Sequence, residues 1–330
     1  MKTPLRIILA CTLSDRTRPI LDGRVHIDGC DASFVTGEPE DLFARALRTR
    51  AFDITELSLS SHILLTARGD AAYVGVPAFP SRAFRHSAVY VRSDRGIERP
   101  EDLSGKTIGV PEYQQTAGLW MRGILSDDHG VSPSSIRWRS GGLERPGSDE
   151  RIPIRVNDDI DLAPIPRGAT LSAMLAGDQL DGVISPRPPS CFIAGDANVK
   201  RLWRDPRAVE RAFFQRTRLF PIMHVVAIKA ELVHRHPWLP VNVLKAFADA
   251  KQLAIRDLEQ TNFLRVTLPW IDLDRVRELM GEDFWPYGLA PNRRELDAVA
   301  RWSFGEGLAA RRLSPEELFD ASTTTIPANG

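Results

Sequence analysis

The sequence predicts an α/β protein. Short apolar runs alternate along the chain with segments whose apolar residues recur at helical spacing, which is typical of this class. The 330 residues are 43% hydrophobic and 26% charged, enough for one large or two ordinary domains with buried cores. Lys plus Arg and Asp plus Glu each total 43, so no excess of positive charge is available to bind nucleic acid or an acidic membrane surface.

Six apolar runs have the length of buried strands. They cover residues 5–13, 53–59, 87–91, 107–110, 182–185 and 224–229. Residues 8–11 of the first run also look like a lipoprotein cleavage box, but the apolar stretch is too short for a secretory signal and charged residues follow at 15–18. No run approaches the roughly 18 apolar residues that cross a membrane. We therefore expect a cytoplasmic protein with no membrane contact.

Helices are expected between the strands. Pro39 suits a first helical turn, and the apolar positions that follow share one face, which predicts a helix over residues 39–50. Thr170 has the character of an N-cap, and Gly177 ends the short helix that it begins. Later helices are predicted over residues 241–259, 293–304 and 315–319. Residues 141–168 are rich in Pro, Gly and charge without periodicity, so they predict an irregular excursion.

The cysteines and histidines indicate neither a disulfide framework nor a metal site. Cys11, Cys30 and Cys191 are an odd number at wide spacing, which suits reduced thiols. His234 and His236 are two residues apart and have no convergent third ligand. We expect no metal and no cofactor.

Two segments resemble parts of type II solute-binding proteins. Residues 98–110 are similar to the opening of the second lobe of these proteins, and residues 171–185 to a helix and strand of the same lobe. The resemblance implies a two-lobed type II periplasmic-binding-protein-like α/β fold with a central cleft. Lobe one would be discontinuous, with residues 1–97 and 219–330, and lobe two would span residues 98–218.

Five further runs, spread over both lobes, resemble the 4,5-dihydroxyphthalate decarboxylases. They are residues 56–61 (Glu-Leu-Ser-Leu-Ser-Ser), 79–87 (Phe-Pro-Ser-Arg-Ala-Phe-Arg-His-Ser), 111–117 (Pro-Glu-Tyr-Gln-Gln-Thr-Ala), 220–224 (Phe-Pro-Ile-Met-His) and 285–289 (Trp-Pro-Tyr-Gly-Leu). Such enzymes release one carboxylate of 4,5-dihydroxyphthalate as carbon dioxide and leave protocatechuate. The family pattern has glycine where Arg218 stands.

The resemblance implies a cofactor-independent carboxy-lyase of phthalate degradation. Its partner would be a small aromatic carboxylate, and we expect a homo-oligomer. The alternative is a solute-binding protein or sensor for such a ligand.

Loss of carbon dioxide from an arene requires a proton on the ring carbon that bears the carboxylate, so a general acid is needed. His86 and His224 are the candidates, with Glu56 and Glu112 as carboxylic acid alternatives. His86 is preferred because arginines accompany it. His224 stays open because neighbouring positive charge would lower the pKa of His86.

Arginines are the expected ligands of the substrate carboxylates, because the guanidinium fork matches a carboxylate. Arg16 and Arg18 follow the first strand, where an open sheet presents its ligand crevice, although solvated loop arginines would explain them equally well. Arg82 and Arg85 stand close to His86, and Arg187 could close the cleft from lobe two.

Hydroxyl and backbone groups are expected to hold the catechol and an anion. The hydroxyl candidates are Ser58, Ser60 and Ser61, which could instead cap the next helix. Tyr113, Gln114 and Thr116 stand where a helix opens after a strand, so backbone N–H groups there can bind an anion.

Overall fold

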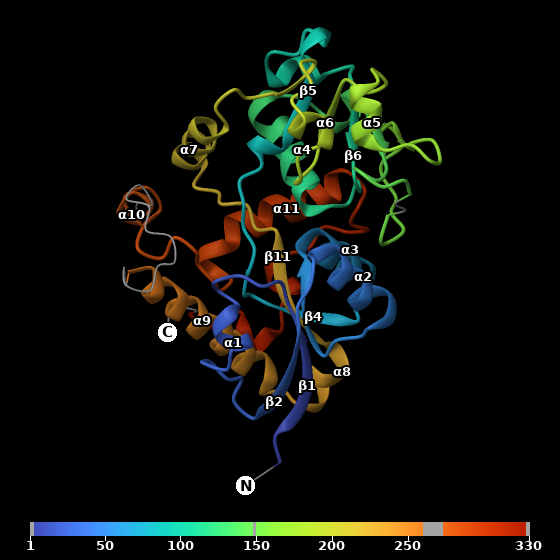
Figure 1. Cartoon of the computed structure of the whole chain (residues 1–330). Helices are drawn as coiled ribbons and strands as arrows, with labels where there is room; N and C mark the ends of the chain where they lie inside the picture. Colours follow the sequence, from blue (N-terminus) through green and yellow to red (C-terminus); the bar gives the residue numbers. More distant parts are fainter. Residues whose placement is uncertain (1–2, 148–149, 260–272, 328–330) are drawn as a thin grey trace.

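The computed structural model describes residues 3–147, 150–259 and 273–327. These residues form two β-sheets with helices around them (Figure 1). The first sheet has the strand order β2-β1-β3-β11-β4. Its strands are β1 (Leu5–Ala10), β2 (Cys30–Val35), β3 (Ile54–Ser58), β4 (Tyr73–Val76) and β11 (His224–Lys229). Strand β1 pairs in parallel with β2 and β3, whereas β11 is antiparallel to both β3 and β4.

The second sheet has the order β10-β5-β9-β6-β7-β8. Its strands are β5 (Val89–Arg92), β6 (Thr107–Val110), β7 (Arg137–Ser140), β8 (Leu162–Pro164), β9 (Gly182–Ile184) and β10 (Val199–Arg201). Strands β6 to β9 pair in parallel, and β5 is antiparallel to its neighbours β9 and β10.

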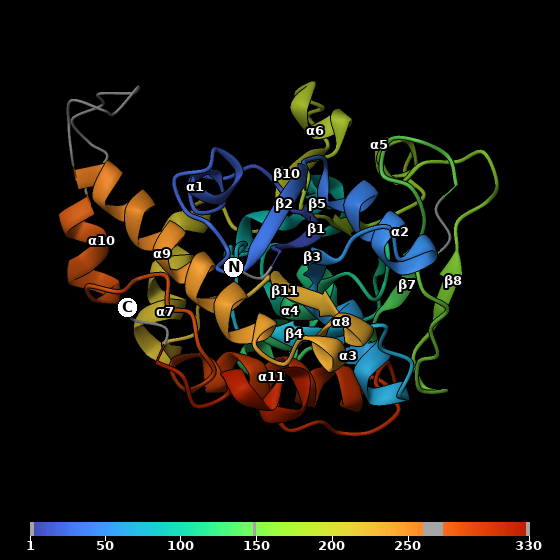
Figure 2. The same cartoon turned by 90° about the horizontal axis from the view of Figure 1, so that it is seen from below.

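Helices cover both sheets (Figures 1 and 2). Those around the first sheet are α1 (Arg18–Leu21), α2 (Pro39–Thr49), α3 (Leu59–Arg68), α8 (Ala230–Arg235) and α9 (Leu239–Glu259). The others are α4 (Thr116–His129), α5 (Leu171–Ala176), α6 (Ser190–Ile193), α7 (Pro206–Thr217), α10 (Leu273–Met280) and α11 (Arg293–Gly305). Helix α8 packs on β4 and β11, while α2 packs on β3. Helix α11 contacts both α3 and α4 and so joins the two lobes.

Two chain segments cross between the lobes side by side. The segment after β4 and the segment before β11 are joined by a backbone bridge between Arg82 and Ile222. The N–H groups of Met223 and His224 both donate to the carbonyl of Ser81. This paired crossing brings the start of β11 to the junction of the two lobes, as Figure 1 shows.

The six predicted strands all form, but one belongs to the other lobe. Residues 87–91 were expected in lobe one, whereas β5 pairs with β9 and β10 in the second sheet. Its four residues are buried on both faces, so periodicity alone carried no sign of which sheet they join. We propose that the first lobe boundary lies in the crossing segment before β5 and not at residue 97.

Local sequence signals explain several element ends. Helix α2 begins at Pro39 and buries Leu42, Phe43 and Ala46. Thr170 caps α5 by accepting the N–H of Ala173. Arg218, which stands where the family pattern has glycine, follows α7 with a φ of 58°, the left-handed conformation that favours glycine. The helix predicted over residues 315–319 is a short 3₁₀ helix over Pro315–Leu318. Among the described residues, no helix is long and apolar enough to cross a membrane.

Candidate active site

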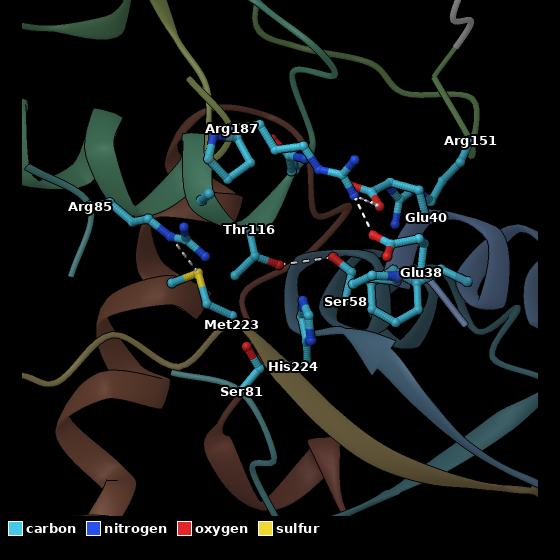
Figure 3. A pocket seen from close by; sticks show the side chains of 15 residues that line it. Glu38, Glu40, Ser58, Ser81, Arg85, Thr116, Arg151, Arg187, Met223 and His224 are labelled. Atoms are coloured by element: carbon cyan, nitrogen blue, oxygen red, sulfur yellow. Dashed lines mark hydrogen bonds and ion pairs between the residues drawn. The ribbon is translucent and has the colours of Figure 1, made fainter. Parts of the chain in front are cut away.

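A cavity of about 250 Å³ lies between the lobes, and both lobes contribute side chains to it. The first lobe and the crossing segments supply Glu38, Pro39, Glu40, Phe43, Ser58, Ser81, Arg85, Met223 and His224. The second lobe supplies Gln115, Thr116, Ala117, Arg151, Pro186 and Arg187. Figure 3 shows these side chains around the open space. The lining therefore combines charged side chains, among them three arginines, with apolar surface from residues such as Phe43 and Met223.

His224 and Glu56 form a hydrogen-bonded pair at the cavity wall. In the β3–β11 ladder His224 lies opposite Ser58 and Val226 opposite Glu56, so Glu56 and His224 project from the same face of the sheet. His224 Nδ1 lies 2.5 Å from Oε1 of Glu56. The imidazole lines the cavity, whereas Glu56 is only 1% exposed and lies behind it. Because Nδ1 binds the carboxylate, Nε2 is the nitrogen that remains for a ligand.

The surroundings hold Glu56 as an anion. Burial raises the pKa of its carboxyl, but the hydrogen bond and charge of His224 and two hydrogen bonds from Thr12 outweigh burial and bring this pKa below its usual value. The N–H and the hydroxyl of Thr12 both lie 2.7 Å from Oε2. The edge of the Phe43 ring meets the imidazole, with ring centroids 4.9 Å apart. These contacts fix the orientation of His224.

Hydroxyl and amide groups meet at the junction of α3 and α4. The hydroxyls of Ser58 and Thr116 lie 2.8 Å apart, and both residues line the cavity. Gln115 is the N-cap of α4, and the first N–H groups of a helix have no acceptor within it. The start of α4 at Thr116 and Ala117 therefore presents hydrogen-bond donors and a positive helix end to the cavity.

Three arginines line the cavity, and they differ in whether a carboxylate is paired with the guanidinium. Arg187 Nη2 lies 2.8 Å from carboxylate oxygens of both Glu38 and Glu40, which join the lobes across the cavity mouth. Arg151 Nε lies 2.9 Å from Glu112. Arg85 instead donates its Nε to the sulfur of Met223 at 3.2 Å.

His86, the preferred proton donor at the sequence level, lies outside the cavity lining. It is 1% exposed and packs against Trp203 and Phe213. Burial lowers the pKa of its imidazole to about 4, which favours the neutral form near pH 7, a poor proton donor. The prediction missed this because the chain turns into the second lobe directly after Arg85.

Arg82 also differs from its predicted role. Its guanidinium donates to the carbonyls of Phe220 and Pro286 at 2.9 Å and to the side chain of Asn292, with Glu295 at 4.0 Å. The side chain is fully buried. Arg82 therefore ties the crossing segments to the 286–292 loop and does not reach the cavity.

The remaining candidates do not line the cavity. Arg16 stacks on Trp285 and pairs with Asp15, and Arg18 is exposed at the start of α1. Ser61 donates to Gln114, whose amide donates to Glu112, and these contacts join the lobes. The other two residues, Ser60 and Tyr113, are buried.

The structure adds lining residues that the sequence reading did not identify. Arg151 comes from the aperiodic excursion, where no pattern marked it. Glu38 and Glu40 flank Pro39 and read as ordinary residues of a helix start, and only the folded chain shows that they pair with Arg187 of the other lobe. Ser81 and Met223 lie within two of the family-like runs. No three His, Cys, Asp or Glu side chains are grouped as metal ligands in the described part of the chain.

Comparison with known proteins identifies close relatives in sequence. The chain is 48% identical over 317 residues to a 4,5-dihydroxyphthalate decarboxylase from Comamonas testosteroni, with 96% of each chain covered. It is 48% identical over 200 residues to a protein of the same name from Pseudomonas putida, covering 61% of this chain and 78% of the relative. No protein-family model matches the chain.

Solved structures show the fold. The alkanesulfonate-binding protein SsuA from Xanthomonas axonopodis pv. citri aligns with a TM-score of 0.56 at 14% identity, covering 97% of this chain and 99% of the other. The periplasmic aliphatic sulphonate binding protein SsuA from Escherichia coli aligns with a TM-score of 0.55 at 13% identity, covering 97% and 92%. At these identities the likeness establishes the two-lobed binding-protein fold and nothing about the ligand.

Proposed function

The chain belongs to the 4,5-dihydroxyphthalate decarboxylase family, and we propose that it removes one carboxylate of 4,5-dihydroxyphthalate with His224 as the proton donor. The observation that carries this proposal is the hydrogen bond from His224 Nδ1 to the buried carboxylate of Glu56 at the cavity wall. A general acid must lie within reach of the ring carbon, and His224 is the cavity residue suited to that role.

The proposed reaction balances with one proton. The ring carbon that carries the departing carboxylate forms a bond to hydrogen with the proton from Nε2 of His224, while the hydroxyl para to that carbon donates electron density. The bond between the ring and the carboxylate then breaks, its electron pair restores the aromatic ring, and carbon dioxide leaves. Neutral His224 regains its proton from water. Glu56 accepts the hydrogen bond of Nδ1 and keeps the ring aligned, with Nε2 toward the cavity.

The lining also supports an aromatic dicarboxylate as the substrate class. Arginines and the start of α4 can bind carboxylates, and the hydroxyls of Ser58 and Thr116 can bind a diol. Phe43 offers apolar surface for the carboxylate that leaves, because its charge is lost in the reaction.

Turnover of purified protein is the test. The protein is incubated with 4,5-dihydroxyphthalate, and carbon dioxide and protocatechuate are followed together. The proposal predicts equal amounts of both products. Tight binding of 4,5-dihydroxyphthalate without any product would contradict it and would favour the alternative, a solute-binding protein or sensor on the same fold.

We also propose a cytoplasmic location, a role in phthalate degradation and a homo-oligomeric state. Free thiols at all three cysteines support a reducing compartment. Exposed Leu13 and Phe34 near the edge strand β2 support contact between copies. Light scattering of the purified protein measures the oligomeric state.

A further inference from the structure

Arg85 differs from the other two arginines of the cavity in having no carboxylate partner. Arg151 is paired with Glu112, and Arg187 is paired with Glu38 and Glu40. Within the described part of the chain, no carboxylate oxygen lies within 4.0 Å of Arg85. Its Nε is engaged by Met223, so its two terminal nitrogens can face a ligand as a fork.

The position of Arg85 is unfavourable for folding unless an anion joins it. Burial lowers the pKa of its guanidinium to about 10, and the more distant charge of Glu210 opposes this only in part. Arg85 is partly buried, and a cation withdrawn from water without a partner costs stability, so natural sequences rarely keep one without a use. Because its side chain lines the cavity, the missing partner is a cavity ligand.

We propose that Arg85 binds the carboxylate that the reaction retains, and thereby limits the enzyme to one decarboxylation. This inference rests on the proposed function. Figure 3 shows Arg85 with Met223 at one side of the cavity and His224 apart from it, so the two positions are separate. An ortho-dicarboxylate can place one carboxylate on Arg85 and the other beside the acid.

The product explains why such a residue matters. Protocatechuate keeps one carboxylate and a hydroxyl para to it, so it carries the same chemical activation as the substrate and could in principle lose a second carbon dioxide. Its single carboxylate binds best on the unpaired Arg85. In that orientation its reactive carbon lies away from His224, so the product binds as an inhibitor and is not consumed.

The experiment compares wild type, Arg85→Gln and Arg85→Lys with 4,5-dihydroxyphthalate as substrate and protocatechuate as inhibitor. We expect Arg85→Gln to raise KM and the inhibition constant of protocatechuate together, each roughly 10- to 100-fold, because one charge-assisted fork is lost from both complexes. Arg85→Lys should show smaller increases, because it keeps the charge without the fork. Arg216→Gln, an exposed partner of Asp128 outside the cavity, is the matched control and should change neither constant.

Unchanged KM and unchanged protocatechuate inhibition in Arg85→Gln would overturn the inference, as would conversion of protocatechuate to catechol by the wild type. Calorimetric binding of both compounds is measured in parallel. If the wild type binds 4,5-dihydroxyphthalate without turnover, the proposed function fails, while the binding comparison still decides whether Arg85 holds a carboxylate.

Discussion

His224 lies opposite Ser58 in the β3–β11 ladder, two residues from Glu56. A hydrogen bond of 2.5 Å joins the imidazole of His224 at the cavity wall to the buried carboxylate of Glu56 behind it. Glu56→Gln keeps the shape of this side chain but removes the negative charge that Nδ1 of His224 contacts and that orients the ring. We expect kcat to fall roughly 10- to 1000-fold with little change in substrate affinity. Steady-state kinetics and calorimetry measure the two effects, and a loss of affinity with unchanged kcat would show that Glu56 serves binding instead.

Arg82→Met should destabilise the fold without weakening substrate binding. The substitution leaves the carbonyls of Phe220 and Pro286 without their buried donor and the carboxyl of Glu295 without its nearby cation. We expect it to lower the free energy of unfolding by roughly 2 to 4 kcal/mol. Urea unfolding measures the stability and kinetics measure KM. A KM increased tenfold or more, with normal stability, would return Arg82 to the binding site.

Arg218→Gly should stabilise the protein. Arg218 has a φ of 58° after α7, and glycine adopts this conformation without a Cβ penalty. We expect the free energy of unfolding to rise by roughly 0.5 to 1 kcal/mol. Arg50 ends α2 with a φ of 51°, and Arg50→Gly should give a gain of the same sign. A loss of stability in both variants would contradict the strain argument.

Glu150 should make the stability depend on pH. Its carboxylate accepts the N–H groups of Tyr113 and Gln114, and burial, with the nearby charge of Glu112, raises its pKa to about 7. The folded state therefore binds this proton more tightly than the unfolded chain does. The stability that protonated Glu150 contributes is fully present below pH 4.5 and is lost as the pH rises to about 7.

Glu150→Gln cannot ionise, so its stability relative to wild type should increase between pH 5 and pH 8 by roughly 1 to 3 kcal/mol. Urea unfolding of both proteins at the two pH values gives this difference, in which other groups cancel. A difference that stays constant with pH would show that Glu150 has its usual pKa in the folded protein.

Much of the fold could be predicted because its signals are local. All six predicted strands form, since a short apolar run is visible in the sequence alone. Strands β2, β4, β7, β8 and β10 were not predicted, and β8 lies inside the segment 141–168 that was expected to be irregular. Strands β7 and β10 read Arg-Trp-Arg-Ser and Val-Lys-Arg, and their strand pairing comes from neighbours distant in the sequence. The same distance explains β5, whose lobe depends on its partners β9 and β10.

The sequence indicated many of the residues near the site, but it did not show which of their side chains line the cavity. The runs that resemble the family include four residues that the fold brings to the cavity lining, namely His224, Ser58, Thr116 and Arg85. They also include Glu56, which is hydrogen-bonded to His224 behind the lining. The sequence alone could not distinguish Arg82 from Arg85, or His86 from His224. Within each pair one side chain lines the cavity and the other does not, and this depends on how the chain crosses between the lobes. Arg151 lies in an aperiodic loop, and only the folded chain reveals its approach to the cavity.

The most direct measurement compares His224→Asn with His86→Asn, using kcat for 4,5-dihydroxyphthalate and substrate affinity by calorimetry. His224 is the proposed donor in the cavity, and His86 is the matched histidine that is buried outside it. The account predicts that His224→Asn lowers kcat by about a hundredfold to ten-thousandfold while substrate still binds, and that folded His86→Asn keeps nearly normal turnover. Near wild-type kcat in His224→Asn would show that His224 is not the proton donor.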